Sequence, residues 1–195
     1  MTTYLVTSAD EPRWFSVNQH RPEGGEAPKT EGCMRYIPGV GFDVVMRCYE
    51  SDPYISYTQP DDPVFKDSCM EVFLNCYPEL PEYGYINVEI NAAGASRCRF
   101  GTDRNNRYYL AEKGLDRPKI TVTKTVDFWE IHTVISEELL EKLYERPCQF
   151  APGHEMRGNF YKCGEHVPSP HWTSWAAMRR LDFHDPECFG TFKLV

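Results

Sequence analysis

Apolar and polar residues alternate along much of the chain. In residues 41–50, GFDVVMRCYE, every second side chain from Phe42 to Cys48 is apolar, which is typical of a strand with one face in a core. Similar runs, separated by turn residues, lie at residues 68–77, 85–91, 96–100, 107–111, 119–126 and 128–135. Loops rich in polar residues, Gly and Pro lie at residues 18–32 and 51–64. We therefore predict an antiparallel, all-β protein.

One segment has a helical pattern instead. SEELLEKLY (residues 136–144) begins with Ser136, a favourable N-cap, and places Leu139, Leu140 and Leu143 on one side of a helix. We predict a single short helix that covers one end of the β-structure. The chain has 195 residues and no internal repeat, so we predict one domain over residues 1–195.

Two of the predicted strands, FKDSCMEVFLN (residues 65–75) and YINVEIN (residues 85–91), have one apolar and one polar face, because side chains alternate along a strand. The apolar faces consist of Met70, Val72, Leu74, Ile86, Val88 and Ile90. The opposite faces carry Glu71, Phe73, Asn75, Asn87, Glu89 and Asn91. A hairpin with Tyr77 opposite Tyr85 brings the polar residues onto one surface, and a register shifted by two residues does the same.

Carboxylates and amides beside aromatic side chains form a surface that suits a sugar. Hydroxyl groups donate and accept hydrogen bonds together, and the C–H face of a sugar ring packs against an aromatic ring. The alternative is an ordinary solvated sheet face with polar cross-strand pairs. The pattern of residues alone leaves both interpretations open.

Charge and composition narrow the classes of partner. The formal net charge is −8 and the sequence contains no run of Lys or Arg, which argues against binding to nucleic acid or to an anionic membrane surface. No apolar stretch approaches 18 residues and the start has no pattern of a signal peptide, so we expect a cytoplasmic protein. The eight cysteines lack a C-x-x-C pair and are predicted to be free, buried thiols. Trp14 and Trp129 are assigned to the core.

Five separated blocks support a resemblance. PVFKDSCMEVFLN, YINVEINAAG, NFYKCG, HWTSW and DFHDPECFG resemble, in this order, the family 9 carbohydrate-binding modules and their compact bacterial relatives. The resemblance runs from about Val64 to Phe192. It implies an immunoglobulin-like β-sandwich that binds a mono- or oligosaccharide between aromatic side chains without catalysis, with calcium ions in some members.

The resemblance also implies roles for individual residues. Phe65 matches the aromatic residue that stacks on the sugar, where the best-known members have tryptophan. Glu71 matches the acid that binds hydroxyl groups, and Glu89 with Asn91 matches the polar pair of the next strand. Either Trp172 or Trp175 supplies the opposing wall, because their odd spacing directs them to opposite faces of a strand. Asn87 belongs to the same polar row.

Three alternatives use the same sequence features differently. Glu71 and Glu89, as diagonal neighbours about 7–8 Å apart, could act as the two carboxylates of a glycoside-processing enzyme. Related sandwiches hold a b-type haem, and others keep the fold without binding. The acidic residues of DFHDPECFG and of the Asp61–Asp62 loop are the places where calcium would find oxygen ligands.

Overall fold

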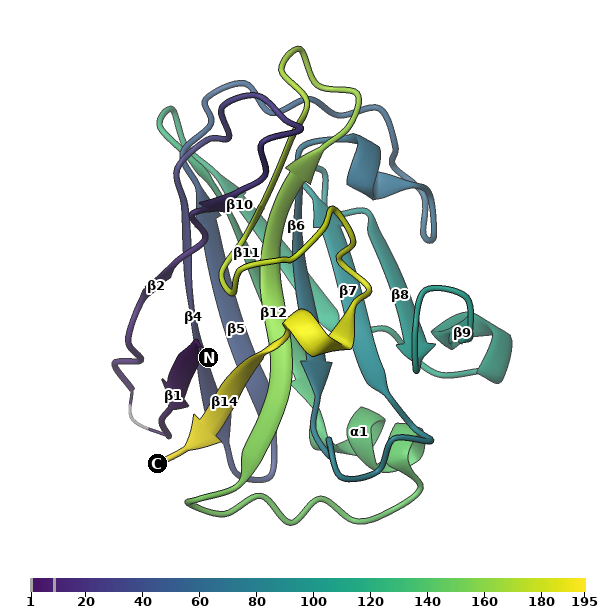
Figure 1. Cartoon of the computed structure of the whole chain (residues 1–195). Helices are drawn as coiled ribbons and strands as arrows, with labels where there is room; N and C mark the ends of the chain where they lie inside the picture. The colour runs from purple at the N-terminus through teal and green to yellow at the C-terminus, as the bar shows by residue number, and fades with distance from the viewer. Residues whose placement is uncertain (1, 9) are drawn as a thin grey trace.

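The computed structural model describes residues 2–8 and 10–195 and shows two β-sheets packed face to face (Figure 1). Within these residues the larger sheet has the strand order β1 (Thr3–Val6), β14 (Gly190–Leu194), β12 (Glu155–Gly164), β6 (Cys69–Asn75), β7 (Tyr85–Asn91), β8 (Ser96–Gly101) and β9 (Arg107–Tyr109). β13 (His171–Ser174) pairs with β12 and with β3 (Gln19–His20). The smaller sheet has the order β10 (Lys119–Lys124), β11 (Trp129–Ser136), β5 (Gly41–Cys48), β4 (Thr30–Ile37) and β2 (Phe15–Ser16).

The structure confirms the predicted β-sandwich and its single α-helix. Helix α1 (Glu137–Tyr144) begins after Ser136, whose Oγ accepts a hydrogen bond from the Leu139 amide at 3.2 Å. It lies at one end of the sandwich (Figure 1). Its Leu140 and Leu143 belong to the main hydrophobic core. One strand pair departs from the antiparallel prediction, because β1 runs parallel to β14.

The N-terminal 40 residues contain more β-structure than their composition indicates. The segment that we assign to a polar loop, residues 18–32, includes β3 and the first residues of β4. β2 and β3 are only two residues long, so no alternation of side chains can be recognised in them. Three short 3₁₀ helices complete the described elements: η1 (Val64–Lys66), η2 (Leu110–Lys113) and η3 (Pro186–Cys188).

The main core lies between the two sheets. It contains the six apolar residues predicted for β6 and β7 and also Trp129, all fully buried. Trp14, in contrast, is 47% exposed and lies beside the guanidinium group of Arg47, so its assignment to the core is wrong. The apolar faces of β6 and β7 thus anchor the larger sheet against the smaller one.

The register of the β6–β7 hairpin differs from our prediction by two residues. Glu71 pairs with Glu89, not with Asn91, and the last pair is Leu74 with Ile86. The chain leaves the sheet after Asn75, whose Oδ1 accepts a hydrogen bond from the Tyr77 amide at 3.0 Å. Because the shift is even, each residue keeps its predicted face.

The outer face of the larger sheet is covered in part. The segment that precedes β14 crosses it, as the yellow chain in Figure 1 shows. This segment contributes Met178, Phe183 and Phe189 to a second apolar cluster, which also contains Phe73 of β6. Within the described residues, no helix has the length and apolar character that crossing a membrane requires.

Candidate functional site

A pocket of about 420 Å³ opens on the outer face of the larger sheet. Its floor is formed by side chains of β6, β7, β8 and β12, and its walls by η1, β9, β13 and the segment before η3. The pocket is lined by Phe65, Glu71, Glu89, Arg97, Arg104, Arg107, Cys163, Glu165, Trp172, Leu181, Phe183 and His184. It therefore combines aromatic, acidic and basic groups.

Two buried glutamates form the centre of the floor. Glu71 and Glu89 are directly opposite each other on β6 and β7, and each is 3% exposed. Burial raises the pKa of Glu71 well above its ordinary value, and the neighbouring Cys163 and Glu89 raise it further. Burial also raises the pKa of Glu89, against the opposing effect of nearby arginines. A proton retained on this pair gives the floor both a donor and acceptors.

The two asparagines of the polar row lie beside the floor but do not line the pocket. Asn87 is fully buried, and its Nδ2 donates to Oε1 of Glu89 at 2.9 Å, which fixes the glutamate. Asn91 is also fully buried, and its Oδ1 accepts hydrogen bonds from the amides of Ala93 and Ala95 at 3.1 and 3.0 Å. Asn87 thus positions an acid, whereas Asn91 holds the turn after β7.

The two tryptophans of HWTSW are separated as their odd spacing predicts. Trp172 is half-buried and lines the pocket. Trp175 lies in the main core, where its ring stacks on Phe192 with centroids 5.1 Å apart. Phe65 lines the pocket too, but the guanidinium carbon of Arg97 is 5.3 Å from its ring centroid, so Arg97 uses one face of that ring. Trp172 is therefore the tryptophan available to a ligand.

The basic residues of the pocket were not predicted from the sequence. Buried and partly exposed residues alternate along β8, with Arg97 next to the buried Cys98. This pattern could have placed Arg97 on the polar face. Arg104 and Arg107 come from the loop after β8 and from β9, and no comparable signal marks them.

His184, in the segment before η3, also lines the pocket. Burial and the adjacent Arg107 lower the pKa of His184 to about 2, so the imidazole is neutral.

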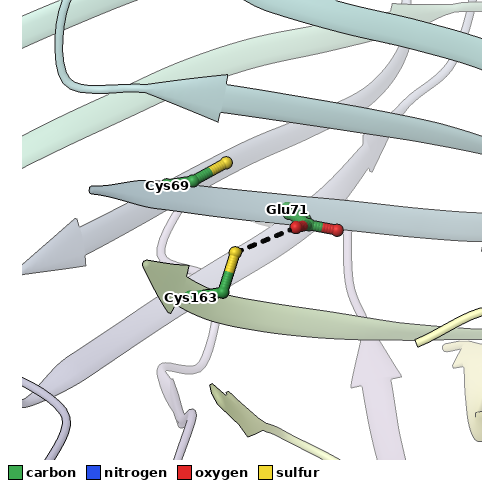
Figure 2. Close-up of side chains that lie close together, drawn as sticks. All are labelled: Cys69, Glu71 and Cys163. Atoms are coloured by element: carbon green, nitrogen blue, oxygen red, sulfur yellow. Dashed lines mark hydrogen bonds between the residues drawn. The ribbon is translucent and has the colours of Figure 1, made fainter. Parts of the chain in front are cut away.

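One cluster on the floor has metal-binding chemistry. The ligand atoms of Cys69, Glu71 and Cys163 lie within 4.8 Å of one another, and Figure 2 shows Cys163 on β12 pointing toward Glu71. The Cys163 thiol donates to Oε1 of Glu71 at 3.1 Å. Two sulfurs and one carboxylate oxygen suit zinc better than calcium. Burial raises the pKa of Cys69 to about 11, so a metal ion would have to displace protons from these groups.

The two loops proposed for calcium do not fit that ion. Asp61 forms a two-pronged ion pair with Arg117, and Oδ2 of Asp62 accepts hydrogen bonds from two backbone amides. In DFHDPECFG, Asp182 pairs with Arg104 at 2.8 Å and Asp185 with Arg179 at 3.1 Å. These carboxylates already have positive or hydrogen-bonding partners, so they do not form a set of oxygen ligands for a cation.

Comparisons with known proteins relate the chain to a recognised family. Residues 36–194 match the sequence model of the family described as Carbohydrate-binding family 9. A proposed carbohydrate-binding protein from Bacteroides uniformis ATCC 8492 has a similar structure, with a TM-score of 0.82, 19% sequence identity and 99% of each chain covered. No curated protein matches the chain.

Two further solved structures are of a family 9 carbohydrate-binding module from Caldicellulosiruptor kristjanssonii. In the complex with cellotriose, the TM-score is 0.72 at 10% identity, over 99% of this chain and 93% of that chain. In the complex with glucose, it is 0.74 at 9% identity, over 100% and 96%. At these identities the likeness establishes a shared fold.

Proposed function

The chain belongs to carbohydrate-binding family 9, and from this premise we propose that it binds a mono- or oligosaccharide, without covalent chemistry, in the pocket above Glu71 and Glu89. The observation that carries the proposal is the convergence of these two acids with Trp172 in a single open pocket. A volume of about 420 Å³ falls within the range of small-molecule sites.

The floor supplies both a hydrogen-bond donor and a hydrogen-bond acceptor. Burial raises the pKa of Glu71 and so favours its protonated form, which can donate a hydrogen bond to a sugar hydroxyl. Oε2 of Glu89 is buried and has no hydrogen-bond partner within the described residues. A buried acceptor without a partner costs about 1–3 kcal/mol, and a sugar hydroxyl would supply the missing donor.

The walls supply the apolar contact. Trp172 and Phe183 line the pocket, and the ring of Phe183 is held against Tyr161 of β12 with centroids 4.0 Å apart. The Phe183 carbonyl also accepts a hydrogen bond from the Tyr161 hydroxyl at 2.9 Å. A rigid aromatic wall suits the C–H face of a sugar ring, since little ordering is needed when the ligand binds. The complexes of the Caldicellulosiruptor module with cellotriose and glucose support the same class of ligand.

Calorimetric titration against a panel of mono- and oligosaccharides tests the proposal. We expect heat of binding with at least one sugar, and loss of that heat in Glu71→Ala and Trp172→Ala. Trp14→Ala is the matched control, because Trp14 is an exposed tryptophan that lies outside this pocket. Absence of binding to every sugar contradicts the proposal. Release of reducing sugar from an oligosaccharide would identify a hydrolytic enzyme instead.

A further inference from the structure

Three arginines around the pocket lack an acidic partner, and from them we infer that the bound saccharide carries an acidic group. Resting on the proposed function, this inference narrows the ligand to a sugar with a carboxylate or with a phosphate or sulfate ester. Arg97, Arg99 and Arg107 form no ion pair within the described residues. Arg104, in contrast, pairs with Asp182 at the rim.

Arg97 and Arg99 are held side by side by aromatic residues. Both occupy the outer face of β8, and both donate a hydrogen bond to the hydroxyl of Tyr109, at 2.7 Å for Arg97. The guanidinium carbon of Arg97 lies between two rings, 5.3 Å from the centroid of Phe65 and 5.5 Å from that of Tyr109. The Nε atoms of both arginines are buried without a hydrogen-bond partner among the described residues. These guanidinium groups are therefore oriented but not neutralised.

Arg107 approaches the same region from β9, and its hydrogen-bond partners among the described residues are uncharged, although Glu89 attracts it from a greater distance. Its Nη1 lies 3.3 Å from Oδ1 of Asn87 and 2.7 Å from Nε2 of His184. Burial lowers the pKa of Arg107, and repulsion from Arg99 lowers it further. The positive charges thus repel each other in the ligand-free protein, and a bound anion would relieve that repulsion.

The acids of the pocket offset the charge of these arginines only in part. Glu89 attracts Arg97, Arg99 and Arg107, but among the described residues neither Glu89 nor Glu165 forms an ion pair with an arginine. Burial favours the protonated, uncharged form of Glu71. In a chain with a formal net charge of −8, Arg97, Arg99 and Arg107 thus lie close together at or beside this pocket without a paired carboxylate among the described residues. Guanidinium groups bind carboxylate, phosphate and sulfate through two parallel hydrogen bonds, and such charge-assisted bonds are stronger than those of neutral groups.

The positions of the charged groups indicate which part of such a ligand contacts which residues. The unpaired Oε2 of Glu89 accepts a sugar hydroxyl, and the acidic substituent meets Arg97 and Arg107. A neutral sugar would satisfy only the first of these contacts. An inorganic anion would satisfy only the second and would leave Trp172 uncovered.

Matched pairs of neutral and acidic sugars test the inference by calorimetry at pH 7 and low salt. The pairs are glucose with glucuronate, galactose with galacturonate, and glucose with its 6-phosphate and its 6-sulfate. This panel distinguishes recognition of a carboxylate from recognition of a phosphate or sulfate ester. We expect at least one acidic sugar to bind about tenfold more tightly than its neutral counterpart, because of the added charge-assisted bonds. Added NaCl should weaken the binding of the acidic sugar but not that of the neutral one.

Arg97→Gln and Arg107→Gln should each remove the preference for the acidic sugar over its neutral counterpart. If only one of the two variants folds, that variant alone is enough for the test. Arg146→Gln is the control, since Arg146 is exposed, makes no ion pair, and lies over the ring of Tyr77 outside the pocket. Equal or tighter binding of the neutral sugars overturns the inference and leaves the proposed function intact. Binding of no sugar overturns the proposed function itself. Binding of inorganic phosphate as tight as that of glucose 6-phosphate overturns the inference, because the sugar would then add nothing to the affinity.

Discussion

Glu71 and Glu89 are directly paired across β6 and β7, and both are buried beneath the same pocket. Acids on neighbouring strands at this position repel each other when both are charged, and burial adds to the cost. Their shared environment explains why both glutamates have raised pKa values. It also makes their protonation a measurable property of the folded protein.

Glu71→Gln should change how stability depends on pH. Because the pKa of Glu71 is raised in the folded state, the folded protein binds its proton more tightly than the unfolded chain does. Its contribution to stability is therefore complete below the unfolded pKa of about 4.3 and decreases as pH rises toward the folded pKa, by up to about 1.4 kcal/mol per pH unit. Urea unfolding between pH 4 and 8 should show this decrease in the wild type but less of it in Glu71→Gln. Glu79→Gln, at an exposed glutamate, should follow the wild type, and an unchanged profile in Glu71→Gln would contradict the assignment.

Replacement of the two tryptophans should separate binding from stability. Trp175→Ala removes a core side chain packed against Phe192 and should lower the free energy of unfolding by about 3–5 kcal/mol. Trp172→Ala removes a half-buried pocket wall and should reduce sugar affinity with a smaller loss of stability. Denaturant unfolding and calorimetry on the same samples distinguish the two effects. Equal loss of affinity in folded Trp175→Ala would show that the core tryptophan also shapes the site.

His171 should make the protein sensitive to acid. It is buried, its Nε2 lies 2.8 Å from Nζ of the buried Lys162, and its Nδ1 lies 2.8 Å from the Ser169 carbonyl. Burial, together with the charge of Lys162, lowers the pKa of His171 to about 4. Below about pH 6.5, His171 therefore binds a proton in the unfolded chain but stays neutral in the folded protein until the pH approaches 4. The free energy of unfolding thus falls as pH decreases from about 6.5 to 4.

His171→Gln and His171→Ala test this arrangement together. Glutamine can still accept a hydrogen bond from Lys162 but does not titrate. Between pH 7 and 4, the free energy of unfolding should therefore fall by roughly 1–3 kcal/mol less in His171→Gln than in the wild type. His171→Ala leaves the buried ammonium group of Lys162 without this acceptor and should be destabilised already at pH 7. The comparison is made from unfolding curves at both pH values. A wild-type acid response in His171→Gln would assign the effect to other groups.

Cys163 should report on occupation of the pocket. Its thiol lines the pocket and donates to Glu71, and the neighbouring Cys69 together with burial raises the pKa of Cys163 well above its ordinary value. Alkylation requires the thiolate, so labelling of Cys163 in the folded protein should be slow at pH 8 and accelerate roughly tenfold per pH unit. Mass spectrometry after iodoacetamide treatment measures this rate site by site. A bound sugar should slow it, whereas labelling of the half-buried Cys148, outside the pocket, should not change.

Several features follow from the sequence because they depend on neighbours along the chain. Alternation in a strand is set by backbone geometry, so the two faces of β6 and β7 could be assigned even though the register was wrong by two residues. The start of α1 could be assigned because Ser136 caps the helix by accepting a hydrogen bond from the amide of Leu139, only three residues ahead. The opposite orientations of Trp172 and Trp175 follow from their odd spacing.

The sequence by itself thus determined the β-sandwich, the helix and the polar face, whereas only the tertiary structure decided what that face contacts. The segment before η3 crosses the outer face and brings Phe183 and His184 onto strands that precede them by about a hundred residues. Arg107 meets His184 only because β9 pairs with β8 at the edge of the same sheet. Such contacts depend on which side chains pack best at long range, and no local periodicity encodes them. For this reason the acids that line the pocket could be placed on the polar face from the sequence, and Arg97 could have been placed there by its alternation on β8, whereas Arg104 and Arg107 could not.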